Sequence, residues 1–403
     1  TGPRLQMLTA DPAANRRIEQ HFSRWSQAIS LPEKLRTLRM ARAGDGEGFA
    51  LLADNPGLRT DVTLDLRLIE ADQVTTPELV LAASSAVYGI TFDEFGNPTA
   101  YHVLRHHPGG THGEWHLPYS RIPAASMIHY FRTDRPGQHR GVPDITPALA
   151  LFAQLRRYIR AVIAAAEIAA TPGGVLYTDA PAAGEQDPIE PMDLIELERG
   201  MLMTMPGGWK LNQIKAEQPT ANFGEFVAAI LNEIARCLNM PYNVAVANSS
   251  GYNYASGRLD HQVYFKSIRV EQSHLEATVL DRILAAWFDE AALIPGLLPQ
   301  GIGPIAEWPH QWFWDGHEHV DPAKEANAQA TRLANHTTTL ADEYARRGQD
   351  WETQIRQRAK ELTLLQELGL TAADALPRNE ESDAQVEDQT QTDPETQTAS
   401  RAA

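Results

Sequence analysis

Apolar residues recur with a helical period near the start of the chain. Asp11-Pro12 offers a capping side chain followed by a first-turn proline. Every three to four residues, one face then carries an apolar side chain: Ile18, Phe22, Trp25 and Ile29. An arginine-rich continuation over 31–43 has the same character. We therefore predict two helices in this segment.

The period changes to two after the glycines at positions 44, 46 and 48. Alternating apolar and polar residues predict half-buried strands at 62–68 and 88–92. The turn-forming residues 94–98 lead to another strand at 101–103, so we expect a hairpin there. A further strand is predicted at 127–131. Residues 47–135 are therefore expected to form a small β-rich unit.

The helical period returns from Pro147 for more than twenty residues and again over 223–238. The first helix is on the order of 35 Å long. Its alanine-rich end, 161–170, allows a neighbouring helix to approach closely, either within one subunit or between subunits. Between the two helices we predict two strands, at 175–177 and 201–205.

A polar loop follows Met240-Pro241-Tyr242, and a long helix is predicted over 256–293. Three further helices have good start signals at Asp321-Pro322, Thr338 and Asp350, and the last ends near Gly369. Long helices and small β units both occur along the chain, so the predicted class is α+β.

Composition and charge narrow the functional classes. With 403 residues, 43% of them hydrophobic, the chain is long enough for several packing units. Its 35 basic and 52 acidic residues give a net charge of −17, which disfavours a protein that grips nucleic acid by its phosphates. No segment is apolar enough to span a membrane, so we expect no membrane span. The residues that follow Thr1 do not form a basic and then apolar leader, so we expect no signal peptide.

Two segments concentrate negative charge. Residues 179–198 contain seven carboxylates, and residues 371–403 contain eight with no aromatic residue. The second segment is predicted to be a disordered tail. The single cysteine, Cys237, excludes an internal disulfide and a cysteine-built zinc site, and we expect it to pack in a core.

Motifs for nucleotide hydrolysis, dinucleotide binding and serine or zinc hydrolysis are absent from the sequence. One histidine cluster comprises His102, His106, His107, His112 and His116. The other is His317-Glu318-His319, with Asp315 and Asp321 nearby. A metal-dependent hydrolase using His317 and His319 is an alternative, but no strand–helix barrel surrounds the pair. We expect solvated histidines, no metal, no cofactor and no catalytic residue.

Several motifs, taken in order, resemble those of lambda-type tailed-phage portal proteins. The run 135–143, RPGQHRGVP, preceded by IHYF at 128–131, carries the resemblance most clearly. Further matches in the same order are 69–74, 93–96, 100–103, 223–226, 241–242 and 253–258. They span roughly residues 5–370. Gly257 departs mildly from the small or polar residue that the family commonly has there.

The resemblance implies a non-enzymatic ring, usually of twelve copies, at one vertex of the capsid. Terminase, through its large subunit, would pump double-stranded DNA through the channel, and the head–tail connector would dock onto the ring. The major capsid protein is the other implied partner. The DNA would pass without sequence specificity. The implied location is the virion, with the host cytoplasm during assembly.

The resemblance also implies a portal fold, with long stem helices, a β-rich wing, a clip excursion and a helical crown. The expected divisions are N-terminal helices and wing, 1–142; stem helices, 143–171 and 217–240; clip, 172–216; tunnel loop, 241–257; wing helix and connection, 258–320; crown, 321–370; and acidic tail, 371–403.

Two sets of site residues follow from these divisions. The tunnel loop would touch the DNA backbone weakly through Asn248, Ser249, Ser250, Tyr252, Asn253 and Tyr254. Serine, asparagine and tyrosine offer hydrogen bonds and stacking faces, although the loop could equally be a connection that packs on a neighbour. The clip would steer a basic partner through Glu185, Asp187, Glu190, Asp193, Glu196 and Glu198, or these carboxylates form a solvated face.

Overall fold

The computed structural model describes residues 2–76, 86–110, 118–170, 174–178, 209–213, 222–299, 308–316 and 322–369. The chain divides into two compact units, Thr1–Trp312 and Phe313–Ala403, and each is described by itself. Helices and small sheets occur together, which confirms the predicted α+β class. None of the described helices combines the length and apolarity that crossing a bilayer requires.

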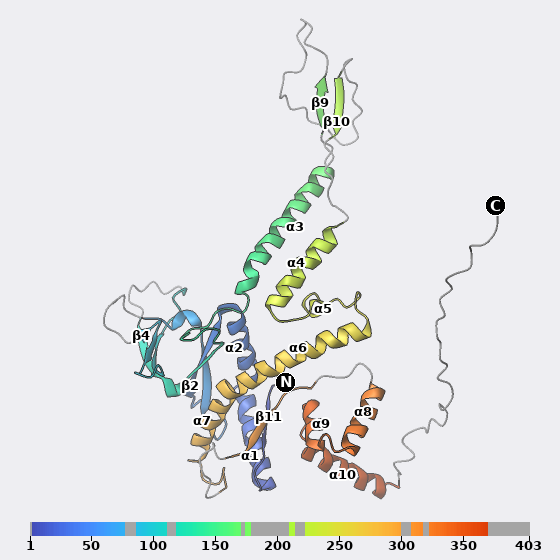
Figure 1. Ribbon diagram of the computed structural model, residues 1–403. Coiled ribbons are helices and arrows are strands. Elements are labelled where there is room, and N and C mark those ends of the chain that lie inside the picture. Colours follow the sequence, from blue (N-terminus) through green and yellow to red (C-terminus); the bar gives the residue numbers. More distant parts are fainter. Residues whose placement is uncertain are drawn as a thin grey trace, which may run out of the picture. The chain divides into compact units, whose positions relative to one another are not determined.

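Helix α1 (Pro12–Ala28) begins where the sequence predicts, because the Asp11 side chain accepts hydrogen bonds from the backbone N–H groups of Ala13 and Ala14. Its apolar face is buried, and the Phe22 ring lies 5.5 Å from the ring of Trp287 on α7 (Asp281–Ala291). Helix α2 (Leu31–Asp45) follows and is also predicted. Figure 1 shows α1 and α2 beside the strands that come next.

Strand β2 (Glu47–Asp54) is the centre of a three-stranded antiparallel sheet between β3 (Leu64–Ile69) and β8 (Met127–Phe131). The second sheet has the order β4 (Ala86–Val87), β5 (Ile90–Phe92), β6 (Pro98–Leu104) and β7 (Tyr119–Pro123). One apolar core joins the two sheets: Phe49, Ile69, Val74, Ile90, Tyr101, Val103 and Met127. Burial in this core raises the pKa of Tyr101 to about 12. A short strand at the start of the chain, β1 (Arg4–Met7), pairs with β11 (His310–Phe313).

The carboxylate of Glu47 is buried at the start of β2 and accepts hydrogen bonds from two segments. His129 Nε2 lies 2.9 Å from one carboxylate oxygen, and Arg140 Nε donates to the other at 2.6 Å. The backbone N–H of Gly141 donates at 2.9 Å. The sequence motifs 128–131 and 135–143 therefore meet at one buried acid.

Arg140 extends this network to three backbone carbonyls. Its guanidinium donates to Val74 O at 2.9 Å, to Tyr88 O at 2.6 Å and to Ala71 O at 3.1 Å. Ala71 and Val74 belong to the motif 69–74, and Tyr88 forms the turn between β4 and β5. One side chain thus fixes the connection between the two sheets.

The charges of this network follow from burial and from the neighbouring groups. Burial raises the pKa of Glu47, but the hydrogen bond from His129 and the charge of Arg140 outweigh it and hold the pKa below its ordinary value. Burial also lowers the pKa of His129, and the nearby Glu47 only partly offsets this. The buried pair is therefore a carboxylate and a neutral imidazole, with Arg140 as the countercharge.

The long helical run after the second sheet is held at two points. Arg42 of α2, 1% exposed, donates to both carboxylate oxygens of Glu271 on α6 (Tyr254–Leu275), at 2.6 and 3.1 Å. Arg282 donates to the carbonyl of Met127 at 2.8 Å. Between these anchors the helix forms a π turn, Glu276–Leu280, before α7. The single helix predicted over 256–293 is therefore continuous but not uniformly α-helical.

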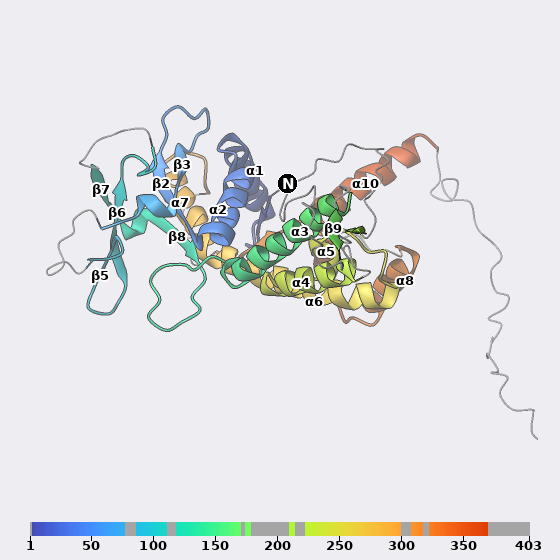
Figure 2. The same ribbon diagram turned by 90° about the horizontal axis from the view of Figure 1, so that it is seen from above.

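Two antiparallel helices, α3 (Leu149–Ala170) and α4 (Phe223–Cys237), pack along one apolar seam. Leu155 and Ile234 are buried in this seam, and Cys237 packs against it partly buried. Figures 1 and 2 both show the two helices side by side. Both helices are predicted from the sequence.

A separate hairpin pairs β9 (Gly174–Thr178) with β10 (Trp209–Gln213). The strand predicted at 175–177 is confirmed by β9. The strand predicted at 201–205 lies outside the described residues, and β10, which pairs with β9, was not predicted.

The second unit contains α8 (Pro322–Ala334), α9 (Leu340–Arg346) and α10 (Trp351–Glu367). Asp350 caps α10 as predicted, whereas α9 is capped by Thr339, one residue after the predicted start at Thr338. Arg332 of α8 donates to Glu343 of α9 at 3.0 Å, and this bond raises the pKa of the guanidinium.

We predict that Gly141→Ala destabilises the first unit. A Cβ at position 141 would lie 2.0 Å from the carbonyl oxygen of Gly46, beside the Glu47 network. The free energy of unfolding should fall by about 1–3 kcal/mol, as in an overpacked core. Gly44→Ala, where a Cβ meets no atom within 4 Å, is the control and should not destabilise. Urea denaturation measures the free energy of unfolding of both variants. Equal denaturation midpoints for Gly141→Ala and Gly44→Ala would contradict the tight contact at Gly141.

Candidate functional site

The predicted DNA-channel residues lie on one loop, between α5 (Tyr242–Ala245) and α6 (Figure 1). Along this loop, Asn248, Ser249, Ser250 and Asn253 are exposed and Tyr252 is half-buried. Tyr254 begins α6. The structure therefore brings the predicted residues together on one surface segment.

Hydrogen bonds within the loop fix its shape. The Asn248 side chain accepts a hydrogen bond from the backbone N–H of Ser250 at 2.9 Å, and Tyr252 N–H donates to Ser249 O at 3.1 Å. The Asn253 side chain caps α6 by accepting from Ser256 N–H at 2.8 Å. Both asparagines thus shape the loop backbone through their carbonyl oxygens.

Asn243 anchors the base of the loop. Its side chain is 4% exposed, and its Nδ2 lies 3.1 Å from Nε2 of His261 on α6. Its backbone carbonyl accepts from Asn248 N–H at 3.1 Å. Just before Asn248, Ala247 has a left-handed φ of 52°, which is uncommon for alanine. The sequence analysis did not identify Asn243 or His261, because neither belongs to the exposed polar run.

The loop and its flanks carry no charge. From Cys237 to Gly257 the chain has no Asp, Glu, Lys, Arg or His, although 22% of the whole chain is charged. Hydroxyl and amide groups can hydrogen-bond to a phosphate without the strong attraction of a lysine or arginine. This segment can therefore contact a polyanion and let it move.

The other predicted site residues divide into two groups. The six clip carboxylates, Glu185, Asp187, Glu190, Asp193, Glu196 and Glu198, lie outside the described residues, as do His112, His116, His317 and His319. In the described part of the first cluster, His107 pairs with Glu70 at 3.0 Å and His102 Nε2 lies 3.1 Å from Thr91 Oγ1. Burial, with the nearby charge of Arg121, lowers the pKa of His102. No group of three metal-ligating side chains forms among the residues that the structure describes.

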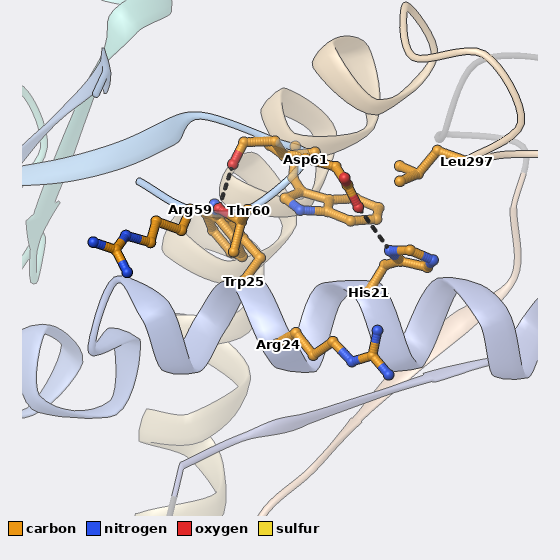
Figure 3. Close-up of a pocket in the computed structure, with 9 residues that line it drawn as sticks. His21, Arg24, Trp25, Arg59, Thr60, Asp61 and Leu297 are labelled. Carbon is orange, nitrogen blue, oxygen red and sulfur yellow. Dashed lines mark hydrogen bonds and ion pairs between the residues drawn. The ribbon is translucent and has the colours of Figure 1, made fainter. Parts of the chain in front are cut away.

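A cavity of about 220 Å³ lies between α1, α7 and the loop 59–62 (Figure 3). His21 and Asp61 pair there at 3.3 Å. Figure 3 shows Arg24 and Arg59 extending away from each other. The cavity therefore does not direct its two guanidinium groups onto a common ligand.

Comparisons by sequence connect the chain to phage proteins. The family model described as phage portal protein, lambda family, matches residues 1–272. A protein named "Probable portal protein" from Halomonas phage phiHAP-1 is 27% identical over 385 residues, covering 90% of this chain and 73% of that protein.

Two solved structures are similar to this chain at lower sequence identity. A chain in the neck of an empty GTA particle, computed with C6 symmetry, is 16% identical with a TM-score of 0.48, covering 82% of this chain and 80% of that one. A chain in the neck of a native GTA particle, computed with C12 symmetry, is 15% identical with a TM-score of 0.42, covering 78% of each. Both TM-scores are below 0.5, so the family assignment rests on the match of residues 1–272 to the family model.

Proposed function

We propose, from the premise that this chain belongs to the lambda family of phage portal proteins, that twelve copies form a ring whose channel conducts double-stranded DNA. The ring lies at one vertex of the capsid, in contact with the major capsid protein. Terminase packages DNA through it, and the ring then retains the DNA and releases it. The head–tail connector docks onto the ring after packaging. Assembly takes place in the host cytoplasm, the mature ring is part of the virion, and its role is structural rather than enzymatic.

The uncharged loop between α5 and α6 is the observation that carries this proposal. A channel for DNA needs contacts that do not hold phosphate, and residues 237–257 offer hydroxyls and amides without any cation. Twelve copies at −17 carry a formal charge of about −204, which repels the DNA backbone in general. A weakly interacting loop in an acidic ring favours sliding over binding.

The proposed parts of the portal map onto the described elements. The two sheets and the N-terminal helices form the wing, and α3 with α4 forms the stem. The β9–β10 hairpin belongs to the clip, and the loop after α5 is the tunnel loop. Helices α8, α9 and α10 form the crown.

We expect the purified full chain to assemble into rings of about 535 kDa, which is twelve times 44.6 kDa. Native mass spectrometry measures the mass, and negative-stain images of the same sample should show a central hole. A chain that remains monomeric at every concentration, also in the presence of its capsid partner, would contradict the ring.

Replacing both Tyr252 and Tyr254 with alanine should impair DNA retention about tenfold, because the loop loses its stacking faces. Packaged DNA per particle, measured after packaging and again after storage, provides the readout. Leu259→Ala, on the exposed face of α6, is the control outside the loop. Packaging and retention at wild-type levels in the double variant would contradict a contact between the loop and DNA.

The clip carboxylates, Glu185, Asp187, Glu190, Asp193, Glu196 and Glu198, are proposed to steer a basic surface of terminase or connector. Because steering acts through long-range charge, the association rate should fall about tenfold when salt rises from 50 to about 500 mM. Stopped-flow mixing of rings with the partner measures this rate. A rate independent of salt would favour a merely solvated acidic face.

A further inference from the structure

The α3–α4 pair presents two chemically different faces beside its seam. On α3, residues spaced by three or four positions are exposed along one side of the helix, about 60–140° around it from buried Leu155: Leu149, Phe152, Arg156, Arg160 and Ile163. We call this set the arginine stripe. On α4, the exposed residues opposite buried Ile234 include Glu225, Phe226, Ala229 and Glu233, which we call the glutamate stripe.

Countercharges lie on the same helices, Glu167 on α3 and Arg236 on α4, but the four charged residues of the stripes form no ion pair with them. Within the described part of the chain, no ion pair joins Arg156 or Arg160 to an acid, and none joins Glu225 or Glu233 to a base. Arg156 and Arg160 are four residues apart, a spacing at which like charges destabilise a helix. Each stripe therefore suits a partner of opposite charge.

The apolar members of the stripes indicate what kind of partner this is. Leu149 and Ile163 are each 52% exposed, Phe152 is 44% exposed, and Phe226 on α4 is 47% exposed. Contacts to DNA phosphates would leave these side chains in water, whereas a protein surface would bury them. The arginine stripe thus fits an acidic and partly apolar protein face, and the glutamate stripe is such a face.

Contacts between aromatic side chains of α3 and α4 show which residues of the two helices lie at the same level along the helix axes. The Tyr158 ring lies 4.5 Å from the Phe226 ring and 5.7 Å from the Phe223 ring. Arg160 follows Tyr158 by two residues, and Glu225 lies between the two phenylalanines in the sequence. Arg160 and Glu225 therefore lie at similar heights along the pair, and rotation about an axis parallel to the helices preserves this match.

We propose that the arginine stripe of one copy packs against the glutamate stripe of the next copy, with Arg160 and Glu225 as a central ion pair. This inference rests on the proposed ring. Because the two stripes differ and lie on different helices of the pair, the contact is heterologous, and a heterologous contact that closes generates a ring. The stripes would thereby set the direction in which successive copies assemble.

Charge reversal in the full chain tests this pairing. Arg160→Glu and Glu225→Arg should each weaken association about tenfold, because each places like charges across the contact. The double variant R160E/E225R restores opposite charges and should recover most of the loss. Sedimentation velocity over a concentration series gives the ring fraction, and circular dichroism confirms the helical content of each variant.

Arg36→Glu is the matched control, since it makes the same charge change at an exposed position of α2, outside both stripes. Its ring fraction should stay within about twofold of the wild type. If the wild type forms rings and both R160E and E225R form them to the same extent, the pairing is overturned but the proposed function is not. Rings that form with R160E but lose DNA retention assign the stripe to DNA and also overturn it. A double variant no better than the single variants counts against the ion pair, whereas a wild-type chain that never forms rings overturns the proposed function itself.

Discussion

A buried carboxylate needs compensating donors, and the first unit is organised around the donors that Glu47 receives. An ionised acid in a low-dielectric interior is costly unless it is paired and hydrogen-bonded. Glu47 obtains one donor from β8 through His129 and two from the segment after it through Arg140 and Gly141. Arg140 then ties the turn of the second sheet to the first. The loop 135–143, which has no regular secondary structure around Arg140, is thereby given one conformation.

Local signals in the sequence are sufficient for much of the fold. Capping by Asp11 and Asp350, the alternation in β3 and the helical period of α3 and α4 each depend on residues close in sequence. The pairing of β1 with β11 and the bond between Glu47 and Arg140, 93 residues apart, depend on tertiary contacts instead. Strand β7 has no buried residue, so no apolar alternation marks it in the sequence.

The candidate site shows the same division. The exposed loop is recognisable because a long run without charge is unusual in a chain this acidic. The residue that anchors this loop is not recognisable in the same way. In the sequence, Asn243 is one polar residue among several, and only the structure shows that it is buried against His261. A single buried asparagine has no sequence signature of its own. Family motifs compensate in part, because the motifs 128–131 and 135–143 contain His129, Arg140 and Gly141, although the motifs alone do not reveal the acid that they serve.

The π turn between α6 and α7 makes the angular phase of this helix as important as its length. A π turn takes up one residue more than an α turn, and one residue corresponds to about 100° of rotation. Glu271 and Arg282, on either side of the π turn, must both face their partners on α2 and at the start of β8. A relative that lacked this one residue would form a regular α-helix with both anchors still facing their partners, whereas any other insertion or deletion would turn one anchor away by about 100° per residue. During evolution, the segment between the two anchors is therefore expected to change in length only by the one residue that the π turn takes up, even where individual side chains vary.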